Sequence, residues 1–127
     1  MTEQWPPDYQ AEYVRRLKLN KQLKENTQLR AAFMLHYRDN PIDWINDWCT
    51  TLDPRKVAPE PRLMPFILFK RQRELVQFLH ECLIDKENGL IEKCRDAGAS
   101  WVCVSFATWL WLFHPESVIG FGSRKEE

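Results

Sequence analysis

The feature that most constrains this chain is the apolar run from Trp101 to Phe113, which only Ser105 and Thr108 interrupt. As an α-helix the run would span roughly 20 Å, whereas the hydrocarbon core of a bilayer is about 30 Å thick. The run is therefore too short to cross a membrane. A helix that is apolar on every side is expected to be buried between the layers of a larger fold. The run thus predicts the interior of an α/β protein.

The first fifty residues are predicted to be helical. Residues 8–38 contain neither proline nor glycine, and their apolar side chains recur at mixed helical spacings. This pattern predicts one long helix or two in series, with the break at Asn20 or Asn26. Pro41 is typical of a first helical position, so a short apolar helix is expected to begin there.

A change of composition divides the chain into three parts. Four prolines fall between residues 51 and 65, and they predict an irregular connector. The helical segment, residues 1–50, is therefore expected to end there, and residues 66–127 are expected to form a separate part. Within that part, the segment from Gln72 to Asp85 repeats apolar residues at helical spacings, which is typical of an amphipathic helix.

The last third of the chain has the order of a βαβ unit. An Asn-Gly turn signal precedes residues 90–94, which are expected to form a strand. A loop at 95–99 leads into the apolar helix, which must end before Pro115, and residues 117–121 are expected to form a second strand. A strand, a loop, a helix and a second strand are the minimal element of a parallel sheet, so the predicted fold class is α/β.

The loop before the apolar helix carries the predicted chemistry. A standard phosphate-binding loop has glycine, four further residues, glycine, lysine and then serine or threonine, between a strand and a helix. Here Gly98 and Ser100 match, whereas Ala99 holds the usual lysine position and Lys93 the first glycine position. Phosphates need backbone N–H groups at a helix N-terminus and a nearby cation, which Lys93 and Arg95 can supply. Polyphosphate binding is one interpretation, and an ordinary turn is the other.

Residues 93–101, Lys-Cys-Arg-Asp-Ala-Gly-Ala-Ser-Trp, resemble the deviant Walker A loop of many phage terminase large subunits, in which lysine opens the motif. Two further segments match in the family's order. Residues 65–72 resemble its adenine-side motif, and residues 119–127 resemble the segment after its first core helix. Residues 44–55 resemble its N-terminal lead-in. The resemblance covers about residues 40–127, and the loop is its most specific part.

The resemblance implies the N-terminal part of an ATP-binding motor that packages viral DNA into capsids. The fold would be a helical lead-in followed by the first, incomplete part of a P-loop (RecA/ASCE-like) parallel sheet, with residues 66–127 as the start of the ATPase core. Lys93 would contact the β- and γ-phosphates of ATP, and Arg95 would assist.

The same resemblance assigns the remaining nucleotide contacts. The backbone N–H groups of Gly98, Ala99 and Ser100 would cradle the phosphates. The Ser100 hydroxyl would hold Mg²⁺ together with ATP, and Gln72 would read the adenine edge.

Hydrolysis by such a motor also needs an acidic residue at the end of a later apolar strand, to hold the metal and position water. No residue in this sequence fits that role. The chain is therefore expected to be a truncated motor without a catalytic residue, without the nuclease part and with little or no activity of its own. Such a truncation would leave a sheet edge unpaired and one face of the apolar helix uncovered, because few strands cannot bury Trp109, Trp111 and Phe113 together. Self-association is therefore expected.

Partners and compartment follow from the same resemblance. The full-length family works with DNA, a portal protein and a small terminase subunit in the cytoplasm of a bacterial host, encoded by a phage or prophage. The N-terminus has no signal-peptide layout, and the four cysteines have no Cys-x-x-Cys spacing, which indicates reduced core cysteines. A cytoplasmic protein without membrane contact is expected.

Two alternatives remain open from the sequence. One is a helicase-like P-loop ATPase fragment. The other is a small helical protein-interaction module with no nucleotide site, supported by the helical first forty residues and by six tryptophans that can form a binding surface. Eighteen basic residues are balanced by eighteen acidic ones, so the net charge is zero, and this argues against a self-sufficient DNA-binding domain.

Overall fold

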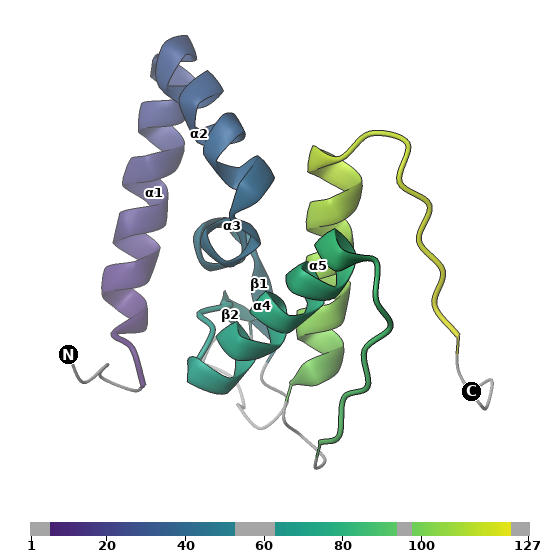
Figure 1. Ribbon diagram of the computed structural model, residues 1–127. Helices are drawn as coiled ribbons and strands as arrows, with labels where there is room; N and C mark the ends of the chain where they lie inside the picture. The colour runs from purple at the N-terminus through teal and green to yellow at the C-terminus, as the bar shows by residue number, and fades with distance from the viewer. Residues whose placement is uncertain (1–5, 53–62, 94–97, 123–127) are drawn as a thin grey trace.

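The computed structural model describes residues 6–52, 63–93 and 98–122, and these form five helices and one two-stranded antiparallel sheet (Figure 1). The helices are α1 (Tyr9–Glu25), α2 (Thr27–Asp39), α3 (Pro41–Trp48), α4 (Lys70–Asp85) and α5 (Ala99–Phe113). The strands are β1 (Thr50–Leu52) and β2 (Leu63–Pro65), which pair with Thr51 opposite Met64.

Helices α1 and α2 form an arm that projects from the rest of the molecule in Figure 1. The Asp8 carboxylate caps α1 by accepting hydrogen bonds from two backbone N–H groups of the first turn. Asn26 ends α1 and also caps α2, because its side-chain oxygen accepts a hydrogen bond from the Leu29 N–H at 3.0 Å. The break between the two helices is therefore at Asn26 and not at Asn20.

The hydrophobic core lies where α3, α4 and α5 meet. Helix α3 begins at Pro41, as predicted. The buried apolar side chains come from these three helices and from the segment before α4: Ile45, Phe66, Leu68, Val76, Val102, Phe106 and Trp109. Trp109 also donates its indole N–H to the Tyr37 backbone carbonyl at 2.6 Å. This hydrogen bond ties the arm to the core.

After α4 the chain folds back along the helix that it has just left. Lys86 adopts a left-handed conformation with φ of 56° and ends α4. A Cβ atom on Gly89 would lie 2.7 Å from Cζ of Phe78 and 3.0 Å from the Cys82 sulfur. Glycine is needed there because the returning backbone passes so close to the α4 side chains.

The predicted α/β class is wrong. The described residues form a mostly helical small domain whose sheet is a single antiparallel pair, and they contain no parallel sheet and no βαβ unit. Residues 90–93 and 117–121, expected as strands, belong to neither helix nor strand. Leu90 is 93% exposed and Val118 is 98% exposed. A strand needs hydrogen bonds to a neighbour and a face to bury, and the described residues provide neither to these segments.

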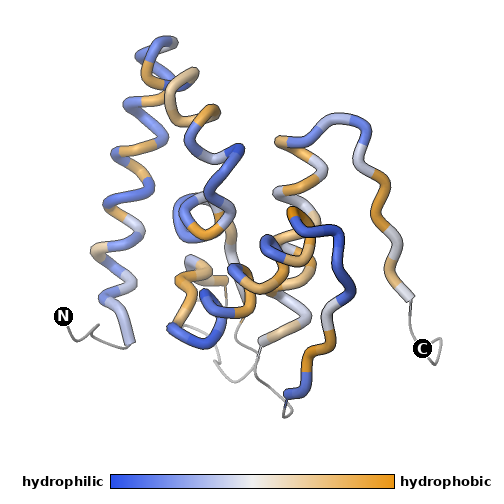
Figure 2. Tube along the Cα trace, in the orientation of Figure 1, coloured by the Kyte–Doolittle hydropathy of each residue, from blue (hydrophilic) through white to orange (hydrophobic). Residues whose placement is uncertain are grey.

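The apolar run does form the predicted helix, α5, but its expected burial on every side is wrong. Figure 2 shows apolar residues along the whole of α5, whereas hydrophilic and apolar residues alternate along α1. Only α2, α3 and α4 pack against α5 substantially among the described elements, so part of its apolar surface stays uncovered. No described helix is both long enough and apolar enough to span a bilayer.

Candidate functional site

Helix α5 has two apolar faces, and only one of them is buried. Val102, Phe106 and Trp109 pack in the core. The other face exposes large side chains, with exposed fractions of 43%, 52%, 66% and 52% for Trp101, Val104, Trp111 and Leu112. Residues three, four or seven positions apart lie on the same side of a helix, so these four form one strip. We call them the α5 face.

The α5 face is uncharged. No residue of α5 carries a charge, and none of its first-turn residues is acidic. The helical spacing places Thr108 within the strip, and its hydroxyl donates to the Val104 backbone carbonyl at 2.8 Å. The hydroxyl on this side is therefore satisfied within the helix, and the two indole N–H groups are the other polar atoms of the strip. The strip can exclude water from a contact, but it contains no titratable group for acid–base chemistry.

The structure brings together two of the residues predicted to bind nucleotide. Gly98 precedes α5 with φ of +75°, a left-handed conformation that favours glycine. A Cβ atom there would lie 2.7 Å from Nε2 of Gln72, so Gln72 packs directly against Gly98. Gln72 is buried, and its Oε1 accepts a hydrogen bond from the Phe69 N–H at 3.2 Å, which closes the first turn of α4.

The other predicted nucleotide contacts lie around the start of α5. Lys93 and Ser100 are exposed, and Ala99 is the first residue of the helix. Lys93 does not end a strand, which corrects its predicted setting. Arg95 lies outside the described residues. The N-cap residue of α5, Gly98, supplies no side-chain cap, and the roles assigned to these residues toward ATP and Mg²⁺ stay predictions.

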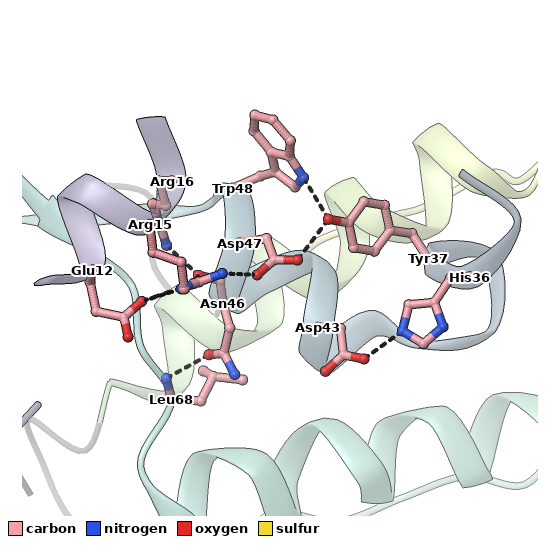
Figure 3. Close-up of polar contacts among 10 residues, drawn as sticks. All are labelled: Glu12, Arg15, Arg16, His36, Tyr37, Asp43, Asn46, Asp47, Trp48 and Leu68. Atoms are coloured by element: carbon pink, nitrogen blue, oxygen red, sulfur yellow. Dashed lines mark hydrogen bonds and ion pairs between the residues drawn. The ribbon is translucent and has the colours of Figure 1, made fainter. Parts of the chain in front are cut away.

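A polar network joins α1, α2 and α3 (Figure 3). The Asp47 carboxylate accepts hydrogen bonds from Nη1 of Arg15 and from the Tyr37 hydroxyl, each at 2.6 Å. The Tyr37 oxygen in turn accepts the Trp48 indole N–H at 3.0 Å. Burial, together with the hydrogen bond to Asp47, raises the pKa of Tyr37, so the phenol stays protonated at neutral pH. The network holds helices together and offers no base poised for catalysis.

Asn46 extends this network in two directions. Its backbone carbonyl accepts hydrogen bonds from Arg15 at 3.1 Å and from Arg16 at 2.8 Å, which fastens α1 to α3. Its side-chain oxygen accepts the Leu68 N–H at 3.0 Å, which fastens α3 to the segment before α4. In Figure 3 the labelled polar side chains of α3 lie between the arginines of α1 and the Tyr37 side chain of α2.

The described cysteines and acidic residues supply no reactive centre. Burial raises the pKa of the Cys49 thiol to about 11 and also raises that of Cys103, so both thiols are protonated at neutral pH. Cys94 lies outside the described residues. Within the described ranges, no group of three or more histidine, cysteine, aspartate or glutamate side chains could hold a metal ion.

Comparisons with protein-family models, with curated proteins and with solved structures find no match to this chain. The function of the chain is therefore inferred from the geometry of the molecule itself. Its two most distinctive features are the uncharged strip on α5 and the contact between Gln72 and Gly98.

Reasoning from the sequence missed the network around Asp47. One local signal was present: Asp43 and Asp47 are four residues apart and therefore share one side of α3. The partners Arg15 and Tyr37 come from other helices, and no spacing rule connects them to Asp47. An uncovered face of the apolar helix was expected, but the sequence did not indicate that Trp111 would be exposed and Trp109 buried.

Proposed function

We propose that this chain is a small helical protein-interaction module and that the α5 face is its docking surface. The observation that carries the proposal is the exposure of Trp101, Val104, Trp111 and Leu112 as one uncharged strip. The centres of protein interfaces are rich in aromatic residues and poor in charge. Exposed apolar patches on a folded domain commonly mark contact sites. The helical architecture supports an interaction module over a nucleotide-driven motor.

The occupant that we propose is the α5 face of a second copy. A helix without charged side chains has no like charges to repel its own copy. In a two-fold arrangement with antiparallel helices, Trp101 of one copy would lie near Trp111 and Leu112 of the other. Each indole ring would then cover apolar surface that is in contact with water in the single chain.

The size of the α5 face sets the expected strength of the contact. With about 200 Å² for an aromatic side chain and somewhat less for valine and leucine, the four residues expose on the order of 400 Å² per copy. Specific and stable interfaces bury roughly 800 Å² per partner. We therefore expect a reversible dimer that depends on concentration, and not an obligate one.

Sedimentation velocity over a concentration series tests this contact. The wild-type chain should shift from monomer toward dimer as its concentration rises. Trp111→Glu should stay monomeric, because dimerisation would bury an unpaired carboxylate. Leu35→Glu is the matched control, since Leu35 is 67% exposed on α2, and it should dimerise like the wild type. A wild-type chain that is monomeric throughout, or a Trp111→Glu chain that dimerises equally well, would exclude the α5 face as the contact.

A second candidate is the ATP-binding front part of a phage terminase large subunit, the DNA-packaging motor that the loop resembles. One observation favours it. Gln72, which is predicted to read the adenine, packs against Gly98 of the predicted phosphate loop, although most of α4 lies between the two residues in the sequence. On this proposal ATP and Mg²⁺ are ligands, and DNA, portal protein and small terminase subunit are the wider partners.

Titration with a fluorescent ATP analogue and Mg²⁺, alongside a phosphate-release assay, separates the two candidates. The motor fragment should bind weakly without releasing phosphate, and Lys93→Ala should remove most of that affinity by deleting the main cation. Lys70→Ala, outside the loop, should leave it unchanged. An interaction module should show no saturable binding. Binding that ignores the Lys93 substitution would exclude the predicted phosphate loop.

A further inference from the structure

A pocket of about 290 Å³ lies between the arm and α3, and it shares no residue with the α5 face. Its walls include five aromatic rings from three helices: Phe33, Tyr37, Trp44, Trp48 and Phe113. Pockets for drug-sized ligands start at about 300 Å³, so this one suits one or two inserted side chains better than an extended cofactor.

The aromatic wall is held in place by its own contacts. The Tyr37 ring lies 5.7 Å from Phe33 and 6.0 Å from Phe113, and Phe113 lies 6.1 Å from Trp44, measured between ring centroids. The Trp48 indole N–H donates to the Tyr37 oxygen, which itself donates to Asp47. The polar atoms of Tyr37 and Trp48 in this wall are therefore already satisfied. An apolar group can enter without breaking a hydrogen bond.

One edge of the pocket is positively charged. Lys24 and Arg30 line it, and no acidic side chain does among the described residues. Arg30 is fixed at the end of α1, because it donates to the backbone carbonyls of Leu23 and Lys24 at 3.0 and 3.2 Å. The two acidic side chains of α3 are already paired, Asp47 with Arg15 and Asp43 with His36. The edge is cationic although the chain as a whole carries no net charge.

We propose that this pocket binds a short acidic segment of a partner protein. One aromatic side chain of the segment inserts among the five rings, and its neighbouring carboxylates lie beside Lys24 and Arg30. Burial of the aromatic anchor supplies most of the affinity, and the two cations select acidic flanks. A cationic anchor is disfavoured, because the same two side chains repel it in spite of the aromatic wall.

Fluorescence anisotropy with labelled synthetic peptides tests the proposal. The probe has one phenylalanine flanked by glutamates, and two control peptides replace the phenylalanine with alanine or the glutamates with lysine. The wild-type chain should bind the probe saturably and the controls much more weakly. Lys24→Glu should weaken binding of the probe roughly fivefold to tenfold, and added salt should reduce this difference in affinity. Lys21→Glu is the matched control on α1, outside the pocket, and should bind the probe like the wild type.

Each other outcome overturns part or all of the inference. No saturable binding of the probe to the folded wild-type chain excludes the pocket as a peptide site. Equal binding of the alanine peptide excludes insertion of an anchor, and equal binding of the lysine peptide excludes selection by charge. The monomeric Trp111→Glu chain should bind the probe as well as the wild type does. Failure of dimerisation and failure of peptide binding are therefore separate results.

Discussion

At the scale of single residues, Asp47 and Tyr37 decide how the arm joins the rest of the molecule. The Asp47 carboxylate bonds to α1 through Arg15 and to α2 through Tyr37, and the Tyr37 oxygen also holds Trp48. Because Tyr37 is buried, its hydroxyl has no water to replace these partners. The same ring forms part of the pocket wall. Removing its oxygen should therefore loosen both the helix packing and the pocket.

Tyr37→Phe should lower the free energy of unfolding by about 1.5–3 kcal/mol, since it deletes a hydrogen bond to a charged group and leaves the Trp48 N–H without its acceptor. Chemical denaturation followed by circular dichroism measures the change. Tyr13→Phe is the control, because the exposed Tyr13 hydroxyl donates to a single carbonyl, that of Leu63, at 2.8 Å. Its loss should cost less than about 1 kcal/mol. Equal losses of unfolding free energy in the two variants would contradict the role of the Tyr37 hydroxyl in joining the helices.

The raised pKa of Tyr37 also predicts a dependence of stability on pH. A phenol ionises with a pKa near 10 in the unfolded chain, and folding raises that pKa. Its contribution to stability is therefore fully present below about pH 10 and is lost as the pH rises through the higher folded value. The free energy of unfolding should fall more steeply above pH 10 in the wild type than in Tyr37→Phe. Parallel curves for the two chains would show that the phenol is not held in its neutral form.

At the scale of one element, α5 shows that an apolar sequence does not determine which side of a helix is buried. Trp109 and Trp111 are two positions apart and chemically identical. Trp109 is fully buried and bonded to the Tyr37 carbonyl, whereas Trp111 is 66% exposed. Neighbouring positions on a helix point about 100° apart, so two positions are enough to place these rings on different sides.

Substituting each of these tryptophans in turn tests the assignment. Trp109→Ala should lower the free energy of unfolding by about 3–5 kcal/mol, because it empties a core position and removes the indole hydrogen bond to the Tyr37 carbonyl. Trp111→Ala should change it by less than about 1 kcal/mol when unfolding is measured at low protein concentration, where the chain is monomeric. Similar losses at both positions would mean that the α5 face is covered in the isolated chain.

At the scale of the whole molecule, the core of α3, α4 and α5 carries the fold, while two extended segments lie outside it. Residues 88–93 and 117–122 flank α5 in the chain, and neither segment joins the sheet: residues 88–93 fold back along α4, and residues 117–122 extend from the end of α5 (Figure 1). Two of their apolar residues, Leu90 and Val118, are almost fully exposed. Neither segment contributes a side chain to the hydrophobic core.

Amide hydrogen exchange should reflect this division. Amides of residues 88–92 and 117–122 should exchange fastest, since no backbone hydrogen bond among the described residues protects them. Amides near Val76 and Phe106, in α4 and α5, should exchange slowest. Protection at Leu90 or Val118 comparable to that of α5 would show that these segments are paired in solution. That result would restore the strands that the sequence predicted.

Neighbouring residues alone predict most of the helices of this protein. The hydrogen bonds of a helix run between residues four apart, so the start at Pro41 and the helical state of α5 depend on nearby residues, whereas the choice of Asn26 over Asn20 as the break came from the structure. Tertiary structure decided the rest. Residues 90–93 and 117–121 read as strands, yet a strand exists only beside another strand, and the described residues supply no such neighbour. Contacts between segments far apart in the sequence decide the remaining features: the burial of one side of α5, the contact of Gln72 with Gly98 and the hydrogen bonds of Asp47. The spacing of residues within one segment carries no information about such long-range contacts.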